Sequence, residues 1–182
     1  MQNDEIAALN FSGWPIPDDF LTEIGRTAAL WANLESFLNI CLGKLAGFDE
    51  PLDYRVFILT AHSSFPQRLE SFGALCDQLY PEYPHLAGYR KVVSEIKVAQ
   101  TTRNKFMHHS MSRNPDTGLI EMAVGSARGA LKTKIEVISI EDIKRASIQI
   151  DKAQRALYKR VLRQDVPPVW RQLKQEDGKD SG

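Results

Sequence analysis

Apolar residues recur at alternating spacings of three and four positions along most of this chain, and no other sequence feature constrains the fold as strongly. In the first long stretch the stripe consists of Ile24, Ala28, Trp31, Glu35, Leu38, Leu42 and Leu45. Comparable stripes occur within 65–79, 84–111 and 139–161. Because positions three and four apart share one face of an α-helix, we predict four long amphipathic helices.

Residues that favour helix ends delimit these stretches. Pro17 and the two aspartates after it suit the first turn of a helix, so the first long helix is expected to begin there. Ser64 with Gln67, and Ser139 with Asp142, have the spacing of a capping box. The sequence therefore predicts where three of the four helices begin.

Two segments depart from the helical period. Residues 52–62 are dense in apolar and β-branched side chains, which favours a short helix but leaves a strand open. In 118–138 the apolar residues alternate on both sides of a glycine-containing turn at 125–129, which predicts a β-hairpin. In its second strand we expect Thr133, Ile135 and Val137 on the core side, and Lys132, Lys134 and Glu136 facing water.

Together these elements predict a mostly α-helical chain: an up-and-down bundle of four to five helices with one β-hairpin before the last long helix. A length of 182 residues suits a single domain, which we assign to 17–165. Residues 1–16 are expected to form an N-terminal arm that packs through Phe11 and Trp14. Residues 166–182 are expected to form a partly disordered C-terminal extension.

Charge and composition narrow the class of protein. Lys+Arg and Asp+Glu are equal at 23 each, so any nucleic-acid binding must be local. Cations do concentrate between 144 and 174, either as a solvated helix face or as a track for nucleic acid. Cys41 and Cys76 lie in apolar helical patterns and are expected to be buried thiols. With no secretory signal and no apolar run of membrane-spanning length, we expect a cytoplasmic protein without membrane association.

The segment 97–111 places an arginine, an amide and two adjacent histidines on one predicted helix. Arg103 falls on the apolar stripe, whereas Asn104 and His108 lie four apart on the adjoining polar face. Arg103 and His108 are separated by roughly 140° around an ideal helix. They can act together only if the helix ends or unwinds near His108, or if a second copy of the chain supplies half of the site.

Glu35 is the corresponding misfit in the stripe of the first helix. A carboxylate and a guanidinium on two inner faces would each be costly to bury alone. We therefore predict that Glu35 and Arg103 are both buried and paired between helices. Such a pair can be purely structural, or it can support a functional site.

The residues RNKFMH at 103–108 resemble the R-x-x-x-x-H signature of the HEPN superfamily, in which a polar residue follows the arginine. The first long helix, with Trp31, Glu35 and Leu38, is similar to the first bundle helix of bacterial members. The resemblance implies an all-α bundle and a homodimer in which two signatures meet in one cleft. It also implies, for many members, metal-independent RNA cleavage in toxin or antiphage systems. His109 departs from the family pattern, since many members carry a small residue there.

The chemistry of RNA cleavage accounts for these residue types. Cleavage through the 2′-hydroxyl needs a base, a proton donor for the leaving oxygen and a cation for the phosphate. Histidine can serve either proton role, and the planar fork of arginine suits phosphate oxygens. We predict Arg103, Asn104 and His108 as catalytic residues, with Asn104 orienting His108, and Glu35 and His109 as supporting residues. No metal or other cofactor is expected.

Two functions are consistent with these features. The first is a metal-independent endoribonuclease that cleaves single-stranded RNA as a homodimer, with an antitoxin or a nucleotidyltransferase as protein partner. The second is a non-catalytic dimeric bundle that binds nucleotide or nucleic acid through Arg103 and His108, or regulates a partner protein. His109 is expected to be a surface residue or a gate to the site.

Overall fold

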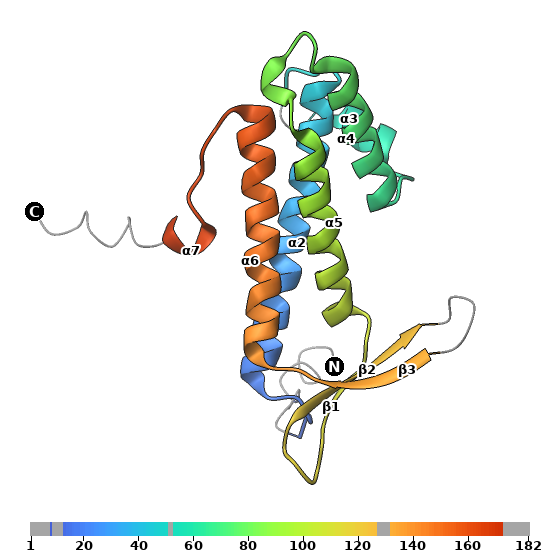
Figure 1. The fold of residues 1–182 in the computed structure, drawn as a ribbon, viewed down its shortest axis with the longest axis vertical. Coiled ribbons are helices and arrows are strands. Elements are labelled where there is room, and N and C mark those ends of the chain that lie inside the picture. The colour runs from blue at the N-terminus through green and yellow to red at the C-terminus, as the bar shows by residue number, and fades with distance from the viewer. Residues whose placement is uncertain (1–7, 9–12, 51–52, 127–131, 173–182) are drawn as a thin grey trace, which may run out of the picture.

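The computed structural model describes residues 8, 13–50, 53–126 and 132–172 of the chain. Long helices run along the molecule, and the strands lie at one end of it (Figure 1). The long helices are α2 (Asp18–Leu45), α4 (Phe65–Leu79), α5 (Tyr89–Met107) and α6 (Ile140–Leu157). The shorter helical elements are α3 (Tyr54–Thr60), the 3₁₀ turn η1 (Pro84–Leu86), the π-helical turn η2 (Tyr158–Leu162) and α7 (Val169–Gln172).

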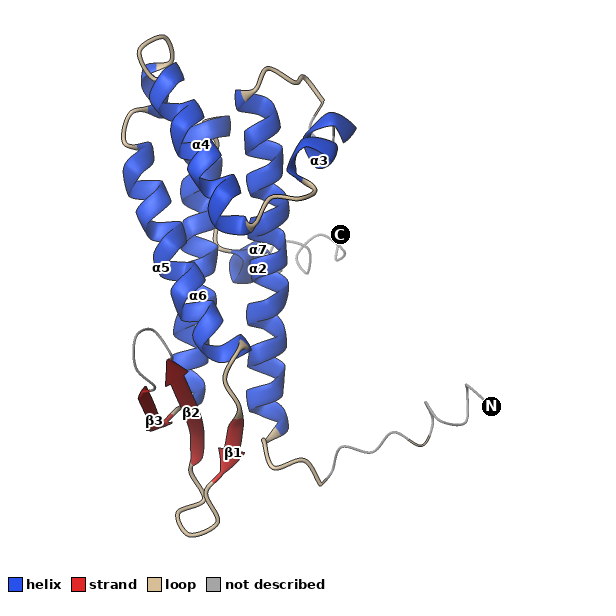
Figure 2. Cartoon of the chain, turned by 90° about the vertical axis from the view of Figure 1, so that its right-hand side faces the viewer, coloured by secondary structure: helices blue, strands red, loops and turns tan. Residues whose placement is uncertain are grey.

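Helix α2 lies at the centre of the helical layer. It packs against α4, α5 and α6, and α5 also packs against α6 (Figures 1 and 2). The prediction of a mostly helical chain with strands before the last long helix is confirmed. Segment 52–62, for which the sequence left helix and strand open, contains the short helix α3.

Both predicted capping boxes are present. The Ser64 and Ser139 side chains accept from the backbone N–H groups of Gln67 and Asp142, whose side chains accept in return from the two serine N–H groups. In the second box the Ser139 N–H and the Arg145 guanidinium lower the pKa of Asp142 to about 2. Helices α4 and α6 therefore begin where short-range sequence signals predicted.

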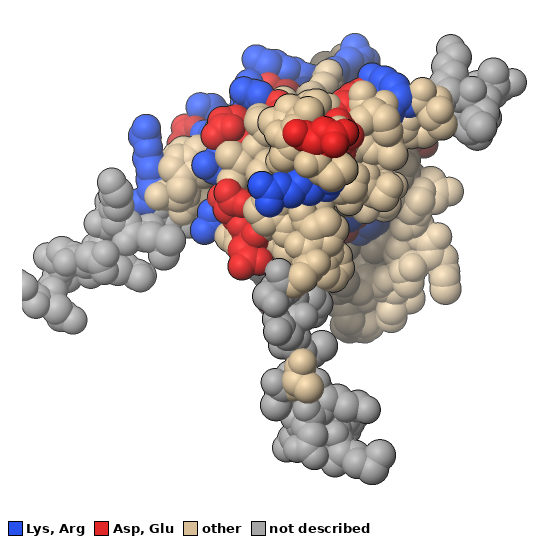
Figure 3. Space-filling view, turned by 90° about the horizontal axis from the view of Figure 1, so that it is seen from below, with Lys and Arg blue, Asp and Glu red and all other residues tan. Residues whose placement is uncertain are grey.

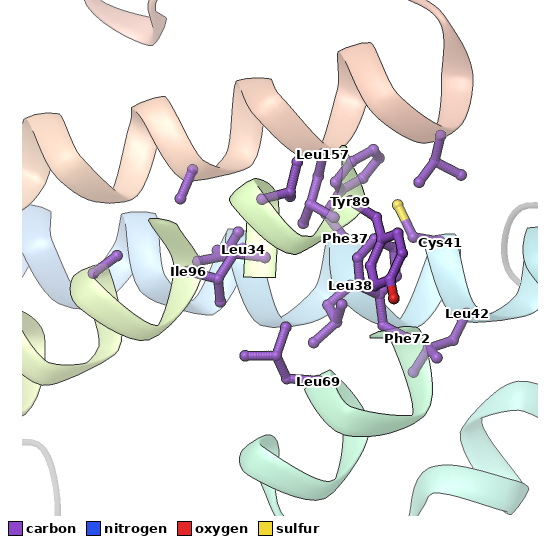
Figure 4. Packing of buried hydrophobic residues seen from close by; sticks show 14 of the residues in the cluster. Leu34, Phe37, Leu38, Cys41, Leu42, Leu69, Phe72, Tyr89, Ile96 and Leu157 are labelled. Carbon is purple, nitrogen blue, oxygen red and sulfur yellow. The ribbon is translucent and has the colours of Figure 1, made fainter. Parts of the chain in front are cut away.

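The main core lies between the four long helices (Figure 4). The apolar stripe predicted for α6 is buried along its whole length, from Ile143 to Val161. In α2 the stripe is rotated from the prediction, because Ile24 and Ala28 are only half-buried. The buried residues of α2 are Glu23, Thr27, Trp31, Leu34, Phe37, Leu38, Cys41, Leu42 and Gly43. A helix packed on three neighbours buries more than one stripe, so the 3–4 pattern alone did not locate its inner face.

The strands form a three-stranded antiparallel sheet in the order β1-β2-β3 (Figure 2). They are β1 (Met111–Arg113), β2 (Ile120–Ser126) and β3 (Lys132–Val137). The predicted hairpin is confirmed as β2 and β3, but β1 was missed. The sequence placed residues up to Met111 in the preceding helix, whereas α5 ends at Met107 and Met111 pairs with Met122.

A second apolar cluster joins this sheet to the ends of α5 and α6. It contains Phe106 from α5, Met122 from β2 and Ile143 from α6, all of them buried. Ile16 belongs to the same cluster, whereas Trp14, which was predicted to anchor the N-terminal arm, is 53% exposed. Phe11, the other predicted anchor, lies outside the described residues.

The orientation predicted for β3 is wrong. Met122 pairs with Glu136, and Val124 pairs with Lys134, so these charged residues lie on the face that carries buried Met122. Ile135 is 65% exposed on the opposite face. On this face Glu136 meets Lys105 near the end of α5, whose Nζ lies 2.5 Å from a Glu136 oxygen, and Lys134 pairs with the same carboxylate. Alternation determines which residues share a face, but not which face points inward.

The C-terminal extension is described as far as residue 172. The Val169 N–H donates to Asp151 Oδ1 at 3.0 Å, which attaches the segment containing α7 to α6. Disorder was expected for the polar tail at 175–182, which lies outside the described part. Among the described helices, none has the length and apolar character needed to cross a bilayer.

The inverted strand leads to a prediction about acid stability. Hydrogen bonds from Lys105 and Lys134 lower the pKa of Glu136 from 4.5 to about 2. A carboxylate with a lowered pKa stabilises the fold above its unfolded-state value, and this contribution is lost as the pH falls through the folded-state value. We expect Glu136→Gln to lower Tm at neutral pH, and the difference from the parent to shrink as the pH falls from about 4.5 to about 2.

Thermal unfolding followed by circular dichroism over this pH range measures the effect. Glu82→Gln is the matched control, because Glu82 is exposed and forms no ion pair within the described residues. A Tm difference for Glu136→Gln that stays constant down to pH 2 would contradict the role given to these ion pairs.

Candidate functional site

The signature residues meet because α5 ends one residue before His108. His108 has φ −120° and ψ 3°, outside the helical region, although its N–H still donates to the Asn104 carbonyl at 3.1 Å. With this end to the helix, His108 Nε2 lies 3.2 Å from Arg103 Nη1. The sequence required either an end of the helix near His108 or a second copy of the chain. The structure shows the first: the helix ends, and the two residues meet within a single chain.

Three contacts orient the Arg103 guanidinium. Its carbon Cζ lies 5.7 Å from the ring centroid of Trp31 on α2, and Nη1 donates to Asn104 Oδ1 at 3.1 Å. The third contact is the one to His108. The half-buried side chain has a buried Nε without a hydrogen-bond partner in the described structure. Nη2 has no partner there either and is not buried, so it is available to a ligand.

The predicted ion pair between Glu35 and Arg103 does not form. Both residues are half-buried, and Glu35 Oε1 lies 3.5 Å from Nη2 of Arg68 on α4. Arg68 also donates to Asn39 Oδ1 at 2.9 Å. The prediction failed because it took Glu35 to be on the inner face of α2, whereas Leu34 and Leu38 occupy that face.

Sequence reasoning missed the aromatic support under the two arginines. Phe65 and Trp31 pack with ring centroids 4.6 Å apart, at an interplanar angle of 55°. The Cζ atom of Arg68 lies 5.8 Å from the centroid of Phe65, and that of Arg103 lies over the Trp31 ring. Cation–π contacts of this kind favour a guanidinium that is held flat against a ring. Trp31 was assigned only to the core stripe, and no spacing in the sequence indicated its contact with Arg103.

The contact between Arg103 and His108 determines which ring nitrogen carries the proton. A guanidinium can only donate, so Nε2 must accept and the proton of a neutral ring must be on Nδ1. His108 itself is exposed, and its Nδ1 has no partner among the described residues. In this state the site offers one hydrogen-bond donor from the ring and one from Arg103 Nη2 to an incoming ligand.

His109 is half-buried beside the end of α5. Its Nδ1 lies 2.9 Å from the Lys105 carbonyl oxygen, to which a protonated ring nitrogen can donate. The last carbonyl groups of a helix have no partner within the helix, so this contact satisfies one of them. His109 thus supports the end of α5 and, through it, the position of His108.

Other candidate groups do not join this site. Cys41 and Cys76 are buried as predicted, and burial raises the pKa of the Cys76 thiol to about 12 and also raises that of Cys41. Neither thiol is accessible as a nucleophile. Within the residues that the structure describes, no group of three or more His, Cys, Asp or Glu side chains is placed to hold a metal ion.

Four of the eight described cations between 144 and 171 form ion pairs. The cations of this region that pair with carboxylates are Arg145, Lys152, Arg155 and Lys159. Seen from the end of the molecule that carries the sheet, positive and negative side chains are interspersed (Figure 3). The described surface therefore favours a solvated face over a continuous track for nucleic acid.

Comparison of the chain with models of protein families, with curated proteins and with solved structures gives no significant match. The resemblance to the HEPN superfamily therefore rests on the residues and geometry given above, and membership stays a prediction.

The protonation of His108 can be tested directly. We expect ¹⁵N chemical shifts to place the proton of neutral His108 on Nδ1, with Nε2 as the acceptor for Arg103. In Arg103→Met the acceptor contact is lost, and the proton should shift toward Nε2, the preferred position in free imidazole side chains. His62, which has no side-chain hydrogen bond in the described structure, is the internal control and should be unchanged. An Nε2–H tautomer in the parent protein would exclude the contact in solution.

Proposed function

We propose that this protein is a metal-independent endoribonuclease of the HEPN type, an up-and-down helical bundle that cleaves single-stranded RNA. The observation that supports this most is the 3.2 Å contact between Arg103 Nη1 and His108 Nε2 at an exposed helix end. His108 can transfer protons and Arg103 is a cation suited to phosphate, and the contact places both within reach of the same phosphodiester group.

Binding of a phosphate gives a simple order of events. The phosphate oxygens compete for Arg103 Nη1 and Nη2, and their negative charge makes them better acceptors than a neutral ring nitrogen. When Nη1 turns to phosphate, the lone pair of His108 Nε2 is released and can take the proton of the 2′-hydroxyl. The 2′-oxygen then bonds to phosphorus, the bond to the 5′-oxygen breaks, and a 2′,3′-cyclic phosphate is left.

Arg103 stabilises the charge that builds on the phosphate oxygens in this step. Its position over Trp31 is already set, so the only rearrangement needed when the substrate binds is the turn of Nη1 from His108 and Asn104 to the phosphate. Asn104 acts on the arginine by accepting from Nη1, and not on His108 as its place one turn earlier had predicted. The leaving 5′-oxygen needs a proton from a second group, which water or a second histidine can supply.

The proposal predicts a separation of catalysis from binding. Positioned proton transfer contributes about 10²- to 10⁴-fold to rate, so His108→Ala should lose about that much in single-turnover cleavage of a single-stranded RNA. Its affinity for the RNA should be nearly unchanged. Arg103→Ala should weaken both binding and cleavage. Cleavage by the parent protein should persist in excess chelator.

The substrate provides the sharpest control. An oligonucleotide with one 2′-deoxy residue at the cleaved position should bind normally and resist cleavage there. Equal cleavage of this substrate would show that the 2′-hydroxyl is not the nucleophile. If no RNA is cleaved while a nucleotide binds and Arg103→Ala abolishes that binding, the non-catalytic function takes the place of the nuclease.

We also propose that the active species is a homodimer. Arg103 and His108 meet within one chain, so the angle between them on the helix does not require a second copy. Cleavage nevertheless needs two proton transfers, and each chain offers one histidine, His108, for them. The outer face of the sheet supports a homodimer, because the edge strand β3 exposes Ile135 and Val137, at 65% and 57%, on either side of Glu136, which pairs with Lys105 near the end of α5.

Mixed dimers distinguish a shared site from two independent ones. Parent and His108→Ala chains with different tags are coexpressed in varying ratios, and the total cleavage rate is measured. If both histidines are needed, activity should fall as the square of the parent fraction, to about one quarter in an equal mixture. Independent sites would give a linear fall, to about one half. A monomer by light scattering that still cleaves RNA would also exclude the dimer.

A further inference from the structure

The end of the molecule opposite the sheet contains a hollow of about 440 Å³ between the ends of α2, α4 and η2. It is separated from Arg103 by most of the length of α5, roughly 1.5 Å for each of its 19 residues. Its volume is within the range of small-molecule sites in proteins. Its walls are largely apolar and include Leu45, Leu79, Leu86, Val161 and Leu162.

Three cationic or protonatable side chains also line this hollow, whereas none of its lining residues is acidic. They are Lys44, His85 and Arg163. Within the described part of the chain these side chains form no hydrogen bond or ion pair, unlike most of the cations on α6. One wall is held in place by Arg160, whose Nη1 donates to the His85 carbonyl at 2.7 Å.

The backbone is also unusual at the edge of the hollow, where Arg163 follows η2. Arg163 has φ 58° and ψ 31°, and among the described residues it alone has a positive φ without being glycine. Glycine is the usual residue at such a helix end, because a side chain there costs free energy. The preceding turn is π-helical, a form that is rare and occurs frequently at functional sites. An arginine in this position therefore points to a role for its side chain.

Charge around the hollow decides which ligand fits it. Helices α2 and α4 and the turn η2 all end here, and a helix C-terminus carries about half a negative charge. Backbone N–H groups that cap the last carbonyls, such as that of Ala46 donating to the Leu42 carbonyl, reduce this partial negative charge. The full positive charges of Lys44 and Arg163 exceed these partial charges. This balance favours an anionic ligand over a neutral one.

We propose that this hollow is a binding site for a small organic carboxylate with an apolar, preferably aromatic, body. The body packs against the leucines of α2, α4 and η1, and the carboxylate lies between Lys44 and Arg163. The site is independent of the proposed nuclease centre at the other end of α5, and its test does not use RNA.

Titration calorimetry of the full chain with 2-naphthoate tests this site. We expect saturable binding below about 1 mM, with the neutral 2-naphthamide bound at least about tenfold more weakly. Lys44→Met should lower the affinity for 2-naphthoate about tenfold or more, through loss of a charge-assisted contact. Lys91→Met is the matched control, because Lys91 is exposed near the start of α5 and does not line the hollow.

Arg163→Gly separates binding from folding. Glycine relieves the backbone strain at φ 58°, so Tm should stay the same or rise, while affinity for 2-naphthoate falls about tenfold or more. A lower Tm in this variant would mean that Arg163 serves the fold, and would overturn the proposal. No saturable binding of 2-naphthoate, equal binding of the amide, or unchanged affinity in both Lys44→Met and Arg163→Gly would overturn it as well.

Discussion

The early end of α5 is the constraint on which the candidate site depends. Had the helix continued, Arg103 and His108 would point in directions roughly 140° apart. Instead the chain leaves the helical path at His108, and β1 begins at Met111 and pairs with β2. The His109 ring meets the Lys105 carbonyl that the missing next turn leaves without a partner. After Met107 the backbone thus forms hydrogen bonds of the sheet instead of helical ones, and the candidate site lies where the helix ends.

The sheet is therefore part of the site's support and not an appendage to the helices. Phe106, one turn from Arg103, is buried with Met122 in the cluster that joins sheet and helices. On the same face of β3, Glu136 forms an ion pair with Lys105, which neighbours Asn104. These apolar and ionic contacts hold the last turn of α5 from below. Trp31 holds the guanidinium of Arg103 from the side of α2, so both reacting groups are oriented before any substrate is present.

Helix α2 contributes residues both to the helical core and to the candidate site. Leu34 and Leu38 are on the buried face of α2. Glu35 therefore lies at the margin of the core, where it pairs with Arg68. Trp31 is shared, since it is buried in the core and its ring also carries Arg103. The same residue therefore stabilises the fold and orients a candidate catalytic group. An aromatic ring can do both because its edge packs as hydrocarbon while its face attracts a cation.

The sequence alone determined the features that depend on near neighbours in the chain. Both capping boxes, the start of α2, the buried stripe of α6 and the β2–β3 hairpin follow from spacings of a few residues, and the signature residues of the site could be named. Only the tertiary structure decided how those parts face one another. Glu136 lies on the inner face of β3 and pairs with Lys105, and Leu34 is buried on α2 where Glu35 was expected. Helix α5 ends at Met107, and β1 follows it and pairs with β2. Each of these outcomes is set by partners distant in sequence, whose burial and charge outweigh the local period.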